Sequence, residues 1–334
     1  MRDISFFSED RYVYLPSTKN PKVILAVSNA EIARNAHKLY NPFSFKAKVL
    51  KKISRFLFVS FNGLMLNLIK VKPLEKSDFI NYLENKLQTR LTVSIYHATV
   101  KDKVVLQLQS GNQICGYLKF PLNTIGQANI EIEKNAIRLL SEKKIVKPCV
   151  VVDQYNNIPY FIMSELKGQI ESLTDEAVVS LVSRFKKEKK FKLIEHPRVK
   201  ELYKELKALG LKSYKLKMDS IVRGSTVYYY EVFEHGDFAP WNIVKTDEGL
   251  VPFDFEFFVE NGIEYFDLIK YHFQVGRLLK KKKPEELSGY IFNKLKIPEV
   301  SYIVSLFLVK EIIRLMKAEE PYQFQENVLN HICE

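Results

Sequence analysis

The chain has 334 residues, of which 46% are hydrophobic and 27% charged, as in ordinary folded proteins. Its formal charge of +12 is concentrated in residues 1–90, which hold 16 lysines and arginines against 7 acidic residues. No apolar run reaches the length of about 18 residues that a membrane span requires, and no signal-peptide pattern opens the sequence. The three cysteines have neither metal-ligand nor disulfide spacing, so we expect a cytoplasmic protein with reduced thiols.

The basic surplus suggests an anionic partner, which could be a membrane surface, a nucleic acid or a phosphorylated substrate. No nucleic-acid-binding motif accompanies the basic residues, so nucleic acid is not expected as a partner.

Residues 1–90 are expected to form a basic, partly helical N-terminal extension. Short β-prone pieces at 11–15 and 22–27 precede a predicted helix that begins at Ser28, because Glu31 follows it at capping-box spacing. A second helix is predicted over residues 77–86.

Residues 46–72 contain seven basic residues and no acidic one, and an apolar stretch lies between the basic flanks. Two interpretations are open. The segment could be a helix in the plane of an anionic membrane surface, which would make the protein peripheral at a membrane. It could also be a helix buried against the rest of the protein, and this second interpretation is favoured because buried helices are far more common.

Residues 91–165 carry the pattern of a small antiparallel sheet. Alternating apolar positions predict strands at 91–96, 103–108 and 115–120, then a helix at 129–142 and two further strands at 149–152 and 160–163. The third strand contains Lys119, and the helix contains Glu133.

Residues 166–334 are predicted to be mostly helical, with helices over 175–187, 198–209 and 300–316. Within them lies the run His235-Gly236-Asp237-Phe238-Ala239-Pro240-Trp241-Asn242, which fits the spacing H-x-D-x-x-x-x-N of a kinase catalytic loop. A predicted hairpin turning at Gly249 then leads to Asp254 and Glu256.

This spacing suits phosphoryl transfer. Asp237 would orient the acceptor hydroxyl, and Asn242, Asp254 and Glu256 would supply oxygen ligands that hold Mg²⁺ against the triphosphate. The structural alternative makes Asp237 a helix N-cap and Asp254 a lone acid at a strand end. The second acidic cluster, twelve residues after Asn242, favours the catalytic interpretation.

The sequence HGDFAPWN followed by FDFE resembles the aminoglycoside phosphotransferase and choline kinase branch of the protein-kinase-like superfamily, over about residues 91–275. Gly236, where protein kinases carry arginine, indicates the small-molecule branch. The resemblance implies an α+β, bilobal fold. Its small N-lobe (91–165) would have an antiparallel sheet and one helix, its larger C-lobe (166–334) would be mostly helical, and the extension (1–90) would precede both.

The resemblance also implies roles outside the loop. Lys119 would reach the phosphates of ATP while paired with Glu133. This glutamate is preferred to Glu131 because it precedes the apolar face of its helix, as the paired glutamate does in the family. The hinge Ser164-Glu165-Leu166 would bind adenine through its backbone, and His235 would orient the catalytic loop. The chain departs from the pattern in the nucleotide loop, because residues 96–102 contain no glycine.

The sequence therefore predicts an ATP- and Mg²⁺-dependent phosphotransferase that acts on a hydroxyl of a small molecule. A sugar or saccharide-lipid is the first choice of acceptor, because the lysine-rich residues 186–217 suit an anionic or neutral glycan. The alternatives are an amino-alcohol or aminoglycoside kinase, and a catalytically weak or inactive pseudokinase that serves as a binding module. The missing glycines favour the pseudokinase, whereas the presence of Lys119, Asp237, Asn242 and Asp254 opposes it.

Overall fold

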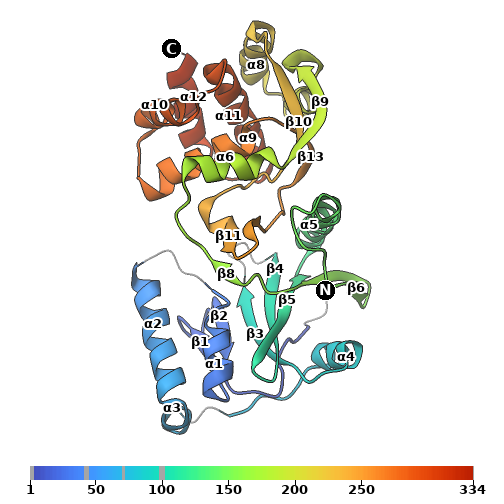
Figure 1. The fold of residues 1–334 in the computed structure, drawn as a ribbon, viewed down its shortest axis with the longest axis vertical. Helices are drawn as coiled ribbons and strands as arrows, with labels where there is room; N and C mark the ends of the chain where they lie inside the picture. Colours follow the sequence, from blue (N-terminus) through green and yellow to red (C-terminus); the bar gives the residue numbers. More distant parts are fainter. Residues whose placement is uncertain (1–3, 41–44, 70–71, 98–101, 334) are drawn as a thin grey trace. The chain divides into compact units, whose positions relative to one another are not determined.

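The computed structural model describes residues 4–40, 45–69, 72–97 and 102–333. The chain divides into two compact units (Figure 1). Unit 1 consists of Met1–Arg138 and Lys147–Leu166, and unit 2 consists of Leu139–Val146 and Lys167–Glu334.

Unit 1 is built on a seven-stranded antiparallel sheet with the strand order β1-β2-β3-β4-β5-β7-β6. Residues 1–90 contribute two of these strands, because β2 pairs with β3. The strands are β1 (Tyr12–Leu15), β2 (Val23–Ala26), β3 (Thr92–His97), β4 (Lys103–Ser110), β5 (Gln113–Pro121), β6 (Val151–Tyr155) and β7 (Ile158–Met163).

The sheet buries alternate side chains because successive residues of a strand point to opposite faces. Val93, Leu106 and Leu118, from three neighbouring strands, are fully buried in one apolar cluster. Phe79 enters the same cluster from a helix, and its ring lies edge-on to the ring of Phe120 at 5.0 Å. This core fixes β5 and therefore the position of Lys119.

The helices of unit 1 are α1 (Ala30–Ala36), α2 (Phe45–Ser60), α3 (Asn62–Leu68), α4 (Asp78–Leu87) and most of α5 (Thr124–Glu142). The N-cap of α1 is Asn29 rather than the predicted Ser28, and the Asn29 side chain accepts a hydrogen bond from the backbone of Ile32. Ser28 instead bonds Asp10.

The favoured interpretation of residues 46–72 as a buried helix is wrong for most of their length. The buried side chains are Ser54 and Phe58 in α2 and Leu66 in α3, whereas most of the other apolar side chains described there are exposed. None of the described helices of the protein combines the length and apolarity needed to cross a bilayer. Lys70 and residues 98–101 of the predicted nucleotide loop (96–102) lie outside the described residues.

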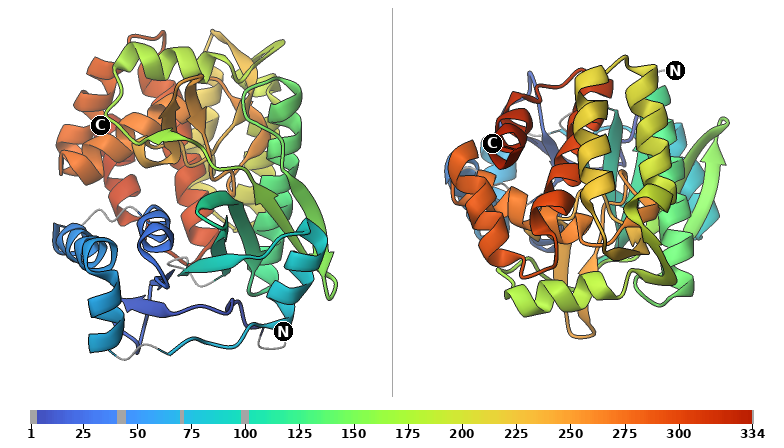
Figure 2. Two further views of the ribbon diagram at one scale, coloured as in Figure 1. Left: turned by 60° about the horizontal axis from the view of Figure 1, so that its bottom comes forward. Right: turned by 90° about the horizontal axis from the view of Figure 1, so that it is seen from above.

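Unit 2 is mostly helical (Figure 2). Its helices are α6 (Asp175–Ser183), η1 (Leu193–Glu195), α7 (Pro197–Ala208), α8 (Lys212–Gly224), η2 (Pro240–Asn242), α9 (Phe266–Gln274), the π-helical η3 (Val275–Leu279), α10 (Pro284–Lys294), α11 (Val300–Lys317) and α12 (Gln323–Cys333). The predicted fold class is confirmed: an α+β chain in which an antiparallel sheet precedes a larger helical part.

Two small antiparallel sheets complete unit 2. One has the order β13-β10-β9 and the other β12-β11-β8. Their strands are β8 (Gly168–Gln169), β9 (Lys186–Lys192), β10 (Tyr228–Glu234), β11 (Ile243–Thr246), β12 (Gly249–Pro252) and β13 (Val259–Ile263).

Strand β9 corrects the sequence prediction, which continued the helix that begins at Asp175 as far as Lys187. The helix ends at Ser183, and the following lysine-rich residues pair with β10. Lysine side chains of β9 lie over tyrosine rings of β10, with Lys190 Nζ 4.2 Å from the ring centre of Tyr230. These contacts are made across the strands, so a local helical pattern did not reveal them.

Candidate active site

The catalytic-loop motif follows β10 and ends in η2. Gly236 has a φ of +81°, a conformation that favours glycine, and a Cβ added there would lie 2.1 Å from the carbonyl oxygen of Phe257. Glycine at this position therefore lets the loop approach the turn that follows Asp254.

The side chain of Asp267, in the first turn of α9, fixes the backbone of the loop. Its Oδ2 accepts from the backbone nitrogen of His235 at 2.8 Å, and its Oδ1 accepts from that of Gly236 at 3.1 Å. Asp267 is buried, and its burial together with the carboxylate of Glu234 raises the pKa of Asp267 to about 7, against the effect of the two backbone donors. This carboxylate is the anchor of the loop.

His235 is buried and makes hydrogen bonds with backbone through both ring nitrogens. Nε2 lies 3.0 Å from the carbonyl oxygen of Phe253, so it carries the proton, and Nδ1 accepts from the backbone nitrogen of Asp237 at 3.4 Å. The imidazole also packs on the ring of Phe255, with the ring centres 4.6 Å apart. These contacts suit a residue that positions the loop rather than one that carries protons.

Asn242 joins the loop to the hairpin that carries the acidic motif. Its Nδ2 donates to the backbone oxygen of Asp237 at 2.9 Å and to its Oδ2 at 3.2 Å. Its backbone oxygen accepts from the nitrogen of Phe253 at 3.0 Å. Asp237 and the start of the acidic motif are therefore held by the same residue.

The acidic motif lies in the turn after β12. The predicted hairpin is present, with β11 paired to β12 and Gly249 at a φ of +116°. Asp254 has a φ of +69°, and Phe255 is fully buried between the half-buried Asp254 and Glu256. The two carboxylates and the amide of Asn242 are oxygen donors of the type that Mg²⁺ takes. Within the described residues, no three or more His, Cys, Asp or Glu side chains gather as a metal cluster.

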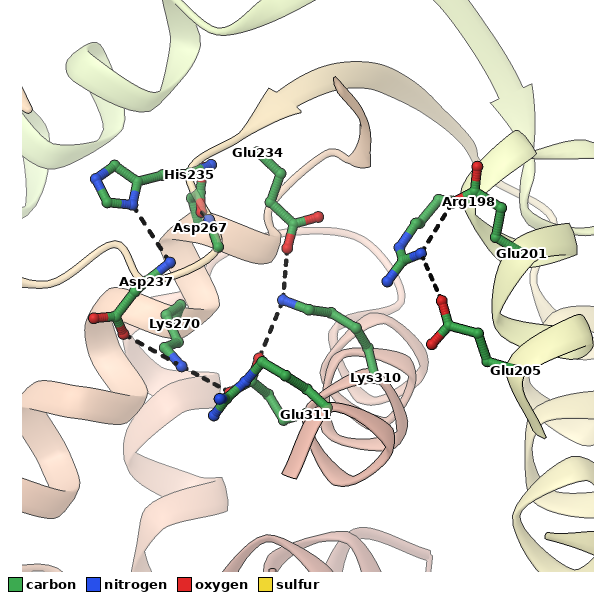
Figure 3. Close-up of polar contacts among 12 residues, drawn as sticks. Arg198, Glu201, Glu205, Glu234, His235, Asp237, Asp267, Lys270, Lys310 and Glu311 are labelled. Carbon is green, nitrogen blue, oxygen red and sulfur yellow. Dashed lines mark hydrogen bonds and ion pairs between the residues drawn. The ribbon is translucent and has the colours of Figure 1, made fainter. Parts of the chain in front are cut away.

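A buried ionic network lies beside Asp237 (Figure 3). Lys270 Nζ, from α9, lies 2.7 Å from Glu311 Oε2 and 3.5 Å from Asp237 Oδ1. Lys310 Nζ bridges Glu234 Oε1 at 2.6 Å and Glu311 Oε1 at 3.1 Å. The cations beside Glu311 hold its pKa well below the usual range, despite burial that acts in the opposite direction.

The contact with Lys270 also fixes the direction of the Asp237 side chain. Gln274 Nε2 also approaches Asp237 Oδ1, at 3.4 Å. Both Lys270 and Gln274 lie on α9, spaced from Asp267 so that all three share one side of the helix. One helix thus contacts both the backbone and the carboxylate of the candidate catalytic loop.

In unit 1, the half-buried Lys119 forms an ion pair with the buried Glu133. Lys119 Nζ lies 2.6 Å from Glu133 Oε1 and 2.8 Å from Oε2. Glu131, the other acid considered for this role on the same helix, is exposed and pairs with Lys134. The burial of Glu133 explains why it, rather than Glu131, meets the lysine of β5.

The hinge residues Ser164, Glu165 and Leu166 follow β7 in irregular, half-buried chain. Glu165 forms an ion pair with Lys38 at 3.5 Å. Its carboxylate is therefore engaged with a lysine just beyond the C-terminal end of α1.

Sequence reasoning missed the site residues of α9 and α11. No role was predicted from the sequence for Asp267, Lys270, Gln274 or Glu311. A usable signal existed for Lys270, because a lysine between Leu268-Ile269 and Tyr271 calls for a buried partner. Glu311, in the apolar helix α11, gives the same signal.

No family model and no curated protein matches the sequence. The structure is similar to those of several small-molecule kinases. A macrolide 2'-phosphotransferase from Brachybacterium faecium matches with 10% identity and a TM-score of 0.47, over 75% of this chain and 95% of that one. The ethanolamine kinase of Plasmodium vivax matches with 11% identity and a TM-score of 0.46, over 91% and 94%. An ADP-bound aminoglycoside phosphotransferase, APH(2'')-Ib, matches with 16% identity and a TM-score of 0.41, over 75% and 95%.

Proposed function

We propose that the protein is an ATP-dependent phosphotransferase that phosphorylates a hydroxyl of a small molecule. The observation that carries the proposal is the joining of Asp237 to the acidic turn through Asn242 and His235. A surface loop with an N-cap aspartate would need neither the buried anchor Asp267 nor the backbone bonds to Phe253.

In the proposed reaction, the acceptor oxygen attacks the γ-phosphorus of ATP, and the bond from that phosphorus to the bridging oxygen of ADP breaks. Asp237 orients the acceptor hydroxyl and takes its proton. Asn242, Asp254 and Glu256 would hold Mg²⁺, which neutralises charge on the phosphate oxygens when bound. Lys119, directed by Glu133, would contact the phosphates, and the backbone of residues 164–166 would bind adenine.

The acceptor proposed is a sugar or saccharide-lipid. The lysines of β9 support a neutral or anionic acceptor less strongly than their number suggests, because Lys186 pairs with Glu264 and Lys187 with Glu231. Lys189 and Lys190 remain exposed to solvent. The proposed partners are therefore this acceptor and, through residues 46–72, an anionic membrane surface; nucleic acid is not proposed.

Two conservative substitutions test the assignment. Asp237→Asn retains the size of the side chain, so ATP binding should persist while turnover falls by roughly 10²–10⁴-fold. Asp254→Asn removes a charged ligand, so both Mg²⁺-dependent ATP binding and turnover should weaken. Binding is measured by calorimetry with and without Mg²⁺, and turnover by ADP release against a panel of glycan, amino-alcohol and aminoglycoside acceptors. Asp247→Asn, on the same hairpin but outside the motif, is the matched control.

The panel separates the competing functions. Turnover with an amino alcohol or an aminoglycoside, and none with a glycan, would correct the acceptor class. Binding of ATP without turnover on any acceptor would favour the pseudokinase. Full turnover by Asp237→Asn would return the loop to a structural role.

A further inference from the structure

Helix α2 exposes an apolar stripe on its outer side. Phe45, Val49, Ile53 and Phe56 recur at helical spacing, so they lie along one face, and the exposed fractions of the three largest are 80%, 52% and 59%. An ordinary surface helix shows the reverse pattern, with its polar side chains outward. We call these four residues the outer stripe.

The opposite side of α2 is attached to unit 1 by both polar and apolar contacts. Ser54 Oγ lies 2.9 Å from Nε2 of the buried His37, and the half-buried Lys51 donates to the backbone oxygen of Tyr40. Phe58 enters an apolar cluster with residues of β2 and α1. The helix is therefore held in one orientation, and its outer stripe is not a side that could simply turn inward.

Helix α3 extends the apolar surface. Leu64 and Leu68 lie one turn apart and are 62% and 68% exposed. The rings of Phe56 and Phe61 meet edge-on with their centres 5.5 Å apart, and both are exposed, so the apolar surfaces of the two helices are continuous. Figure 1 shows α2 and α3 in blue on the far side of α1 from strands β3, β4 and β5.

Basic residues border the outer stripe. Lys48, Lys52 and Arg55 are exposed and lie along one flank of α2 at helical spacing, and Lys46 lies on the other flank. The sequence has no acidic residue from 46 to 72. This arrangement of apolar centre and cationic rim complements a surface that is apolar inside and anionic at its boundary.

We propose that α2 and α3 dock the protein on an anionic phospholipid bilayer, with the outer stripe, Leu64 and Leu68 in the interface and the basic flank at the phosphate headgroups. A second copy of the chain fits this face less well, because a symmetric contact would bring the basic flanks of both copies together. A nucleic acid would engage the cations but give no reason for the exposed phenylalanines. The proposal depends on these two helices alone and not on the phosphotransferase function.

The first test uses wild-type protein without nucleotide. It should co-sediment with vesicles of phosphatidylcholine and phosphatidylglycerol, release as salt rises from about 0.05 to 0.5 M, and stay in the supernatant with phosphatidylcholine alone. In sedimentation velocity experiments without lipid, the wild type and the variant Ile53→Ser/Phe56→Ser should both be monomers. Recovery of the wild type in the supernatant with anionic vesicles at low salt overturns the proposal, whatever the outcome for ATP turnover.

The second test separates the stripe from its rim. Ile53→Ser/Phe56→Ser should weaken vesicle binding by roughly tenfold or more, whereas Leu216→Ser, at an apolar position of α8 that is 70% exposed, should leave it unchanged. Vesicle binding that the double substitution leaves unchanged overturns membrane docking. A wild-type dimer that the double substitution dissociates also overturns it, and assigns this face to a second copy of the chain.

Charge substitutions complete the test. Lys48→Gln/Lys52→Gln/Arg55→Gln should reduce binding by roughly fivefold per charge at low salt and flatten its salt dependence. Lys207→Gln/Lys212→Gln/Lys215→Gln, which removes three exposed lysines of α7 and α8, is the matched control. Equal losses in the two charge variants would show a nonspecific effect of net charge and overturn the assignment to α2.

Discussion

The buried network beside Asp237 predicts a large effect for Lys270→Met, which keeps the length of the side chain and removes its charge. Lys270 lies 2.7 Å from Glu311 and 3.5 Å from Asp237, and its side chain is 5% exposed. Removing one partner of a buried ion pair typically costs about 3–5 kcal/mol, because the other charge stays buried. Here Glu311 keeps Lys310 at 3.1 Å and Arg314 at 3.4 Å, so we expect a smaller loss of about 2–3 kcal/mol.

The loss is measured by urea unfolding at pH 7 as part of a double-mutant cycle. Glu311→Gln should also destabilise, since it leaves Lys270 and Lys310 without their shared carboxylate. The double variant Lys270→Met/Glu311→Gln should lose less than the sum of the single losses, with a coupling of about 1–3 kcal/mol. Additive losses would show that Lys270 and Glu311 do not stabilise each other. So would a Lys270→Met variant whose free energy of unfolding lies within about 0.5 kcal/mol of the wild-type value.

Two further predictions concern unit 2. Gly236→Ala should lower the free energy of unfolding by about 3 kcal/mol or more in urea, because its Cβ would lie 2.1 Å from the carbonyl oxygen of Phe257. Gly210→Ala, at a φ of +69° with open space around it, is the control and should lower it by only about 1 kcal/mol; equal losses would argue against the close approach at Gly236. Burial lowers the pKa values of His196 and His272 to about 4. Below about pH 6.5 the unfolded state therefore binds protons that the folded state does not. The free energy of unfolding should decrease as the pH is lowered from about 6.5 to 4, by at most about 3 kcal/mol per histidine. The double variant His196→Asn/His272→Gln should flatten this part of the stability profile, and an unchanged slope would assign the loss to other groups.

The parts of the site that local sequence could predict are those with a spacing of their own. The loop from His235 to Asn242, the hairpin at Gly249 and the acidic turn are continuous in the chain, and each demands particular residue types at fixed intervals. Glu133 could be preferred to Glu131 from its place relative to the apolar face of α5, and its burial agrees with that choice.

The parts that could not be predicted depend on contacts between distant segments. Lys270 meets Asp237 and Glu311, which are 33 residues before it and 41 after it, and nothing in its own helix specifies either partner. Strand β9 has the composition of a solvated helix, and it becomes a strand because β10 offers it backbone partners and tyrosine rings. The exposure of the apolar side of α2 could not be predicted either, because the sequence shows that the helix has an apolar side but not whether that side packs against the rest of the protein.

The way α9 holds the loop sets a lower limit on what could be transplanted to another scaffold. The motif His235–Asn242, grafted alone, would lack the carboxylate of Asp267, which accepts hydrogen bonds from two of its backbone nitrogens. It would also lack Lys270 beside Asp237. Lys270 would in turn be an unmatched buried cation unless Glu311 came from α11. The smallest portable part is therefore the loop with two helices, and a designer who grafts only the motif should expect its residues but not its geometry.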